Sequence, residues 1–360
     1  MITNERITGV LSQIVDPQLK KDIVTLQHVL RIDIIGNKII LDVLISSPAM
    51  HVKKKMDQLI KDAIYNEFGK DVEIALHLVF NAGTRRSDSK KVLPGVKNII
   101  AVASGKGGVG KSTVASNLAV ALAKMGAKVG LVDADIYGPS VPMMFDTQYV
   151  RPEVIQKEDG KTYIVPVENY GVKMLSIGFF ADVNQAVVWR GPMASKALTQ
   201  MFVDADWGEL DYMLIDLPPG TGDVHLTLVQ AVPVTGSLIV STPQDVALAD
   251  ARKGVAMFTL PNINVPVLGL IENMAWFTPE ELPENKYYIF GKDGVKKLAE
   301  ELNIPLLGQI PLVQRVRESG DKGVPAALED SNPASVYFTD LAEQLIHQVH
   351  LINQKSSIEN

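Results

Sequence analysis

The feature that most constrains this chain is a glycine-rich run between an apolar stretch at residues 99–103 and a helical pattern at residues 112–125. The run reads Gly105-Lys106-Gly107-Gly108-Val109-Gly110-Lys111-Ser112-Thr113. It matches the form G-x-x-x-x-G-K-[ST], in which backbone N–H groups surround phosphates, the final lysine contacts them and the hydroxyl binds Mg²⁺. A strand before the run and a helix after it are the context that the motif requires. The sequence therefore predicts a phosphate-binding loop, with a simple Gly-rich turn as the alternative.

Length and composition limit the classes of protein that this chain can be. Its 360 residues, 46% of them apolar, are enough for one large domain and one small one. A net charge of -6 provides no overall basic field, so we expect no nucleic-acid partner. The absence of cysteine excludes disulfides, thiolate metal sites and cysteine nucleophiles. No apolar run of 18 residues and no signal-peptide core are present, so we expect a cytoplasmic protein without a membrane partner.

A polar, basic segment separates two regions with different patterns. We expect a small α/β domain at residues 1–80, a linker at residues 81–95 and a nucleotide-binding domain at residues 96–360. In the first region, the two-residue turn Gly36-Asn37 indicates a hairpin. The elements expected there are helices at residues 4–15 and 51–68 and strands at residues 29–35, 38–45 and 72–79.

The larger region alternates strands with helices, which predicts a mainly parallel sheet flanked by helices on both faces. In such a fold, ligands bind at the carboxyl ends of the strands. The strands expected after the phosphate-binding loop are residues 129–132, 212–215, 238–241, 267–271 and 306–310. The predicted fold class is thus α/β, a phosphate-binding-loop domain preceded by a small α/β domain.

Carboxylates follow two of these strands, where an ionised group needs solvent or a cationic partner. Asp133 and Asp135 come after the strand at residues 129–132. Asp135 is placed to orient an attacking water. Two interpretations stay open for Asp133, support of a metal shell or the capping of a turn.

The segment from Asp216 to Asp223 resembles a strand that continues into a switch loop. An aspartate at this place can hold Mg²⁺ through water, together with the hydroxyl of Ser112. The N–H of Gly220 is then expected to reach the γ-phosphate. Two prolines between Asp216 and Gly220 stiffen this loop, so that a movement caused by the phosphate state could be transmitted to the surface of the protein. The alternative is a tight Pro-Pro-Gly turn.

Asn273 follows the strand at residues 267–271, and its amide offers the donor and acceptor that an adenine edge requires. A turn residue is the alternative interpretation.

With these residues assembled, residues 96–345 resemble the Mrp family, also called ApbC, of deviant-Walker P-loop ATPases that act as iron–sulfur cluster carriers. The first region is similar to a small domain fused ahead of such ATPases, and Asp16-Pro17 and Asp22-Ile23-Val24 carry that likeness. The motifs of the larger region are residues 105–113, 133–140, 189–193, 207–212, 216–223, 271–274, 310–311 and 317–321.

The resemblance implies a Mg²⁺-dependent ATPase that forms a homodimer, in which Lys106 crosses to the nucleotide of the other subunit. A lysine in trans neutralises charge that develops on the transferred phosphoryl group. It further implies iron–sulfur assembly proteins or apo-protein clients as partners. The residues implied are Lys106, Lys111 and Asp135 for catalysis, residues 105–113 with Gly220 and Asn273 for ATP, and Ser112, Asp133 and Asp216 for the metal.

One departure from the family is decisive for the cluster. Most Mrp proteins carry Cys-x-x-Cys after the Glu-Asn-Met segment, whereas residues 276–285 here contain none, and residues 46–51 lack the cysteine of the small domain. Iron–sulfur clusters are held overwhelmingly by thiolates. Glu280, Glu281 and Glu284 are oxygen ligands better suited to Mg²⁺ or Ca²⁺, and we expect a solvated loop there. His347 and His350 lack a third ligand.

Two functions are therefore expected. The first is an Mrp-type ATPase in cluster carriage or assembly, with clusters supplied through a partner's thiols. The alternative is a nucleotide-gated dimeric adaptor that carries no cluster. The apolar residues of a C-terminal helix fit packing on the core at least as well as membrane binding, which sparse lysine disfavours. Arg190 is assigned to the dimer or switch neighbourhood, or to a helix-entry turn, and His225 to the helix after the switch as a structural residue.

Overall fold

The computed structural model describes residues 2–16, 21–26, 28–45, 50–79, 92–136, 138–180, 191–279, 281–282 and 284–358. The chain divides into two units, Met1–Thr84 and Arg85–Asn360. Each unit encloses a hydrophobic core of its own.

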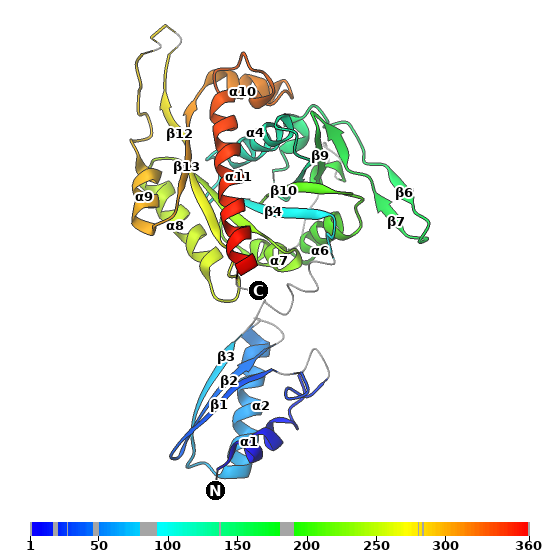
Figure 1. Ribbon diagram of the computed structural model, residues 1–360, viewed down its shortest axis with the longest axis vertical. Coiled ribbons are helices and arrows are strands. Elements are labelled where there is room, and N and C mark those ends of the chain that lie inside the picture. Colours follow the sequence, from blue (N-terminus) through cyan, green and yellow to red (C-terminus); the bar gives the residue numbers. More distant parts are fainter. Residues whose placement is uncertain are drawn as a thin grey trace. The chain divides into compact units, whose positions relative to one another are not determined.

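The small unit is a three-stranded sheet covered by two helices (Figure 1). Its elements are α1 (Asn4–Leu11), β1 (Val29–Ile35), β2 (Lys38–Leu44), α2 (Met50–Phe68) and β3 (Glu73–Val79). β1 and β2 pair antiparallel across a turn in which Gly36 has a φ of 61°. β2 and β3 pair parallel, with α2 as the crossover. Alternate residues of β2, Ile39 and Leu41 among them, share the core with α1 and α2.

The first helix is shorter than the sequence predicts. It ends at Leu11, and Val15 instead forms an isolated bridge with Asp22. Residues 14–16 pair with residues 21–23 instead of continuing the helix: the N–H of Asp16 donates to the carbonyl of Lys21 at 2.9 Å, and the N–H of Ile23 donates to the carbonyl of Ile14 at 3.0 Å. The expected range of residues 4–15 was therefore four residues too long.

The large unit is built on an eight-stranded sheet with the strand order β13-β12-β11-β4-β10-β5-β9-β8. Every neighbouring pair is parallel except β8 with β9. The strands are β4 (Val96–Ala103), β5 (Val129–Asp133), β8 (Val167–Asn169), β9 (Val172–Ser176), β10 (Leu210–Asp216), β11 (Gly236–Ser241), β12 (Val267–Phe277) and β13 (Leu306–Leu312). The predicted fold class is confirmed.

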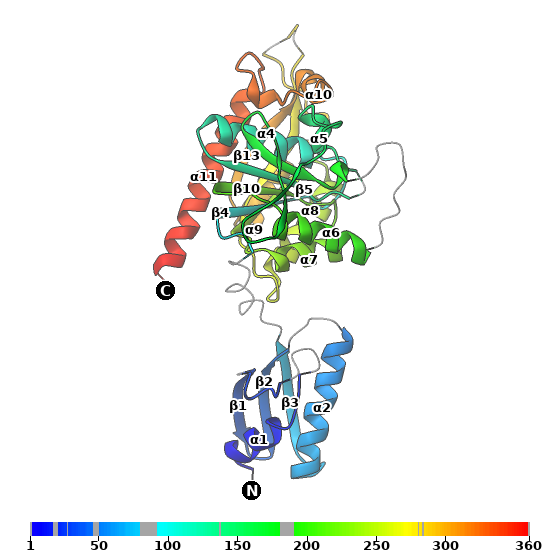
Figure 2. The same cartoon turned by 90° about the vertical axis from the view of Figure 1, so that its right-hand side faces the viewer.

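Helices cover both faces of this sheet because successive crossovers run in opposite directions along it. α4 (Lys111–Lys124) connects β4 to β5, whereas α7 (Asp223–Ala231), α8 (Asp245–Thr259) and α9 (Gly294–Leu302) return toward β13. Right-handed crossovers therefore place α4 on one face and the other three helices on the opposite face, as Figure 2 shows. The remaining helices are α5 (Val141–Met144), η1 (Ile177–Phe179), α6 (Gly191–Val203), α10 (Gln314–Asp321), η2 (Ala326–Leu328) and α11 (Ser335–Ile358).

Several short strands were not predicted. β6 (Val154–Gln156) and β7 (Thr162–Ile164) form an antiparallel ribbon, and β8 and β9 extend the main sheet beyond β5. A strand of three residues is too short for a periodic pattern to reveal it, so the sheet is wider than the sequence analysis indicated.

The C-terminal helix belongs to the core of the large unit. α11 lies against α4 and β13 (Figure 1). Its residues Phe338, Leu341, Leu345 and Val349 are at most 2% exposed. The packing interpretation is therefore confirmed for Leu341, Leu345 and Val349, whereas Val336 of the same apolar pattern is 53% exposed. Among the residues described here, no helix has the length and apolar character needed to span a bilayer.

Candidate nucleotide-binding site

The strands that carry the predicted site residues end at the same edge of the sheet. In the register of the parallel ladder, Asp216 of β10 lies directly beside Asp133 of β5 and beside Val102 of β4. The chain then leaves β4 into the phosphate-binding loop, which leads into α4. The topology thus gathers residues that are more than 100 positions apart in the sequence.

Tertiary contacts explain two glycines of the loop. A Cβ at Gly105 would overlap the backbone of Asp250 in α8, and a Cβ at Gly110 would overlap the side-chain amide of Asn273. Gly108 and Gly110 also have φ values of 80°, a region that L side chains rarely adopt. Glycine is therefore required here for packing as well as for the turn.

Lys111 and Asp216 form a buried ion pair at the base of the loop. The distance from Lys111 Nζ to Asp216 Oδ1 is 2.5 Å, and the two residues are 6% and 0% exposed. Burial raises the pKa of Asp216, and the ammonium group of Lys111 opposes that rise. Among the described residues, the second oxygen of Asp216, Oδ2, is buried without a hydrogen-bond partner. The carboxylate therefore retains an acceptor site for a metal-bound water.

Asp133 is held by three donors of the following turn and of β9. Its Oδ1 accepts from the N–H of Asp135 at 3.2 Å, and its Oδ2 accepts from the N–H of Val141 at 3.2 Å and the hydroxyl of Ser176 at 2.9 Å. The pKa of Asp133 is raised to about 7, mainly by burial and secondly by the negative charge of Asp216. These contacts support the capping interpretation, while the metal role of Asp133 stays a prediction. Asp135 is half-buried and lines the cavity over the loop.

The switch loop is closed against the start of the phosphate-binding loop. Gly220, with a φ of 93°, donates its N–H to the carbonyl of Ser104 at 2.9 Å. This is the N–H that the sequence analysis assigned to a γ-phosphate, so that contact would require the bond to Ser104 to break. His225 lies in α7, as expected, and is buried.

Asn273 contacts the loop itself. Its Nδ2 donates to the carbonyl of Val109 at 2.8 Å, from a side chain that is 7% exposed. The next residue, Met274, has a φ of 55°, and the pairing of β12 with β13 shifts register between Asn273 and Phe277. This irregularity ends the regular ladder where Asn273 meets the loop. The adenine contact stays a prediction, and the structure adds a bracing contact that the sequence did not reveal.

Glu272 is a further residue that the sequence analysis did not assign. It is fully buried, with Oε2 accepting from the N–H of Val295 at 2.6 Å and Oε1 from the amide of Gln309 at 2.7 Å. Its carboxylate therefore holds the first turn of α9 beside the end of β12. A glutamate directly after the apolar run at residues 267–271 was the signal that could have indicated this role.

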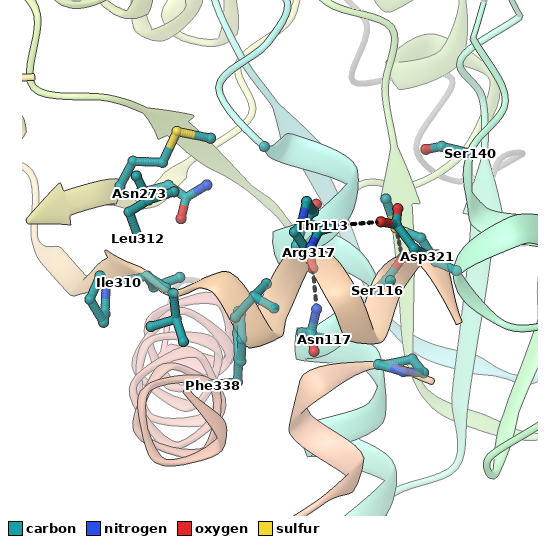
Figure 3. Close-up of a pocket in the computed structure, with 18 of the residues that line it drawn as sticks. Thr113, Ser116, Asn117, Ser140, Asn273, Ile310, Leu312, Arg317, Asp321 and Phe338 are labelled. Atoms are coloured by element: carbon teal, nitrogen blue, oxygen red, sulfur yellow. Dashed lines mark hydrogen bonds and ion pairs between the residues drawn. The ribbon is translucent and has the colours of Figure 1, made fainter. Parts of the chain in front are cut away.

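Two adjoining cavities lie over these elements. One of about 240 Å³ is lined by the loop together with Asp135, Ser140, Met144 and Pro219. The other, of about 250 Å³, lies between α4, the end of β12, β13 and α10 and is mainly apolar (Figure 3). Both are lined by Gly110, Thr113, Ser140 and Met144. A space lined by the phosphate-binding loop thus adjoins a mainly apolar space of similar volume, whose lining suits a nucleoside.

In the second cavity, Asn273, Ile310, Leu312 and Phe338 lie on one side of the view and the α4 side chains on the other (Figure 3). Arg317 lines the cavity and pairs with Asp321 at 2.7 Å.

The residues present fit a magnesium nucleotide. Backbone N–H groups of the loop, the N-terminus of α4 and two lysines suit phosphates. The hydroxyl of Ser112 and the free oxygen of Asp216 suit Mg²⁺, which prefers oxygen ligands and keeps several waters. Lys106 is half-buried and lines the cavity over the phosphate-binding loop. Within the described part of the chain, its ammonium group has no ion-pair partner.

For Glu280, Glu281 and Glu284 the sequence predicts a solvated loop, and for His347 and His350 no metal site. Arg190, Glu280 and residues 46–49 lie outside the described residues. Glu281 and Glu284 are exposed, as are His347 and His350 on α11. In the ranges that the structure describes, no group of three or more histidine, aspartate or glutamate side chains is arranged to hold a metal ion.

Comparison with known proteins identifies the family. A family model described as NUBPL iron-transfer P-loop NTPase matches residues 95–346, and one described as iron-sulfur cluster assembly protein matches residues 4–76. The chain belongs to the family of NUBPL iron-transfer P-loop NTPases. This confirms the resemblance drawn from the motifs.

Relatives of the family share these regions. An iron-sulfur cluster carrier protein of Synechocystis is 42% identical over 98% of this chain and 99% of its own length. One of Escherichia coli K12 is 50% identical over 74% of this chain and 70% of its own. A solved nucleotide-binding protein of Archaeoglobus fulgidus in complex with ADP is 36% identical, with a TM-score of 0.59 over 71% of this chain and 96% of that one.

The cell division ATPase MinD of Pyrococcus furiosus, at 24% identity and a TM-score of 0.51 over 69% of this chain and 98% of that one, shows the same fold.

Proposed function

We propose that this protein is an ATPase of the iron-transfer P-loop family that works in iron–sulfur cluster carriage or assembly in the cytoplasm. The observation that carries the proposal is the buried pair of Lys111 and Asp216 beneath a glycine loop, with a cavity lined by that loop and an adjoining, mainly apolar cavity. Residues 105–113, Gly220 and Asn273 would bind ATP. Ser112 and Asp216, with Asp133, would hold Mg²⁺, which supplies positive charge to the phosphates when bound.

In this proposal, hydrolysis depends on three side chains. Lys111 would leave Asp216 for the phosphates, and Asp135, at the wall of the same cavity, would orient the attacking water. Lys106 would cross to the nucleotide of a second copy in a homodimer. Its lack of an ion-pair partner in the described part of its own chain supports this role.

The cluster would be held by thiols of a partner, because this chain contains no cysteine. The small domain at residues 1–80, joined through residues 81–95 to the ATPase domain at residues 96–360, would recruit iron–sulfur assembly proteins or apo-protein clients. The match of residues 4–76 to an iron-sulfur cluster assembly model supports this assignment.

ATP turnover by the purified protein tests the enzymatic part. We expect Mg²⁺-dependent release of phosphate that is lost in Lys111→Ala and Asp135→Ala. Lys297→Ala and Asp340→Ala make the same chemical changes at exposed positions of α9 and α11 and should retain activity. A pure protein that binds ATP and releases no phosphate would contradict the proposal.

Iron content tests the cluster part. Protein produced anaerobically with abundant iron and sulfide should be colourless and iron-free while it still hydrolyses ATP. Bound iron with the visible absorption of a cluster, in the absence of any partner, would contradict the assignment of cluster ligands to partner thiols.

A second candidate is a nucleotide-gated dimeric adaptor. The hydrogen bond between Gly220 and Ser104 favours it, because this bond connects the switch loop directly to the phosphate-binding loop. The affinity for a cysteine-bearing apo-protein should then differ between ATP, ADP and no nucleotide. A single affinity in all three conditions would leave no free energy to gate binding.

A further inference from the structure

His225 ties together both ends of the switch loop. Its ring Nε2 lies 2.8 Å from the carbonyl of Pro218, and its own main-chain N–H donates to the carbonyl of Gly222 at 3.1 Å. The residue is 1% exposed and lies in the first turns of α7. The side chain of His225 therefore holds the start of the segment that contains Gly220, while its main chain closes the first turn of α7 onto Gly222.

The chemistry of this contact determines the state of the ring. A carbonyl oxygen only accepts hydrogen bonds, so Nε2 carries the proton. Nδ1 is buried and has no hydrogen-bond partner among the residues that the structure describes. Burial lowers the pKa of His225 below its ordinary value, which keeps the ring neutral. The ring is thus a fixed single donor to Pro218.

The part of the switch that is left to move is short. Leu217 donates to the carbonyl of Val102 at 3.0 Å, which continues the pairing of β10 with β4 up to Pro218. With Pro218 held by the side chain of His225 and Gly222 held by the first turn of α7, the segment between them is residues 219–221. At its centre the N–H of Gly220 bonds to Ser104, whose hydroxyl in turn donates to the carbonyl of Lys106 at 2.9 Å.

We propose that His225 is a positioning residue for phosphate sensing, because its side chain fixes Pro218 at the start of the segment in which Gly220 moves between Ser104 and a γ-phosphate. This inference rests on the proposed nucleotide function. Without the hydrogen bond to His225, Pro218 would allow more conformations in which the N–H of Gly220 does not face the nucleotide. Binding of a γ-phosphate would exclude these conformations, which costs conformational entropy. ADP has no γ-phosphate, so its binding would not carry this cost.

The test compares affinities for a non-hydrolysable ATP analogue and for ADP, by calorimetry, in the full-length protein. His225→Leu removes the donor. The affinity for the ATP analogue divided by the affinity for ADP should then fall about tenfold, because one buried hydrogen bond is lost. His225→Gln keeps a donor of similar reach and should restore the ratio to within about twofold. His347→Leu makes the same change on the exposed face of α11 and should leave the ratio unchanged.

Turnover gives a second measurement. We expect kcat of His225→Leu to fall about tenfold with a smaller change in KM, and both values to recover in His225→Gln. If His225→Leu does not fold, His225→Asn, whose amide is too short to reach Pro218, takes its place. A lower melting temperature with an unchanged affinity ratio would show a merely structural role and overturn the proposal. A wild-type protein that binds both nucleotides without hydrolysis would contradict the ATPase activity alone, since the affinity ratio still tests His225.

Discussion

The contact of Asn273 with the phosphate-binding loop leads to a prediction that separates two roles for this side chain. If the amide braces the loop, its loss should weaken every ligand that needs the loop conformation. If the amide recognises the adenine base, its loss should weaken the binding of adenine nucleotides only. The structure favours the brace, because Nδ2 donates to the carbonyl of Val109 at 2.8 Å and lies where a Cβ of Gly110 would be.

Asn273→Leu removes the donor without adding charge. The carbonyl of Val109, in a residue that is 2% exposed, would then be buried without this partner. An unsatisfied buried acceptor costs about 1–3 kcal/mol, which corresponds to a loss of affinity of about 5- to 150-fold if the cost falls on the binding-competent loop.

Calorimetry with ADP, GDP and inorganic pyrophosphate, each with Mg²⁺, measures this effect. We expect the same fold-loss for all three ligands, since pyrophosphate has no base and still needs the loop. Asn285→Leu, in the exposed segment after β12, is the matched control and should bind as wild type does. Weaker ADP binding with unchanged pyrophosphate binding would refute the brace and support adenine recognition.

Three further predictions concern stability. The pKa of Asp133, about 7 against 3.8 unfolded, means that the folded state binds the extra proton between these values, so the free energy of unfolding should fall as pH rises from about 4 to about 7. Urea unfolding across this range should show a smaller slope in Asp133→Asn, and an identical slope would contradict the reasoning. Glu272→Ala leaves the donors of Val295 and Gln309 without their acceptor and should cost about 3 kcal/mol or more, with Glu272→Gln recovering part of it in the same assay. Gly105→Ala overlaps the backbone of Asp250 and should lower the melting temperature of the nucleotide-free protein. Gly107→Ala meets nothing nearer than Pro219 at 3.9 Å and should not, so equal melting temperatures would exclude the steric argument.

Much of the fold followed from local patterns in the sequence. The phosphate-binding loop is one continuous motif, and the apolar runs of β4, β5, β10 and β11 are long enough to be read as buried strands. The strands β6, β7 and β8 were missed because three residues carry too little pattern, and the five-residue β9 was missed because Lys173 interrupts its apolar run. α1 was extended too far because residues 14–16 pair with residues 21–23, a tertiary contact that the helical pattern does not contain.

What the sequence determined by itself was the presence of the phosphate-binding loop, the class of fold and the lack of any thiolate ligand, because each depends on residue type or on neighbours along the chain. Only the tertiary structure decided which side chains meet. Lys111 pairs with Asp216 and Val109 with Asn273 across 105 and 164 positions, and these contacts depend on the order and register of parallel strands. Strand order and register are set by the packing of the whole sheet and its helices, so no local pattern in the chain contains them.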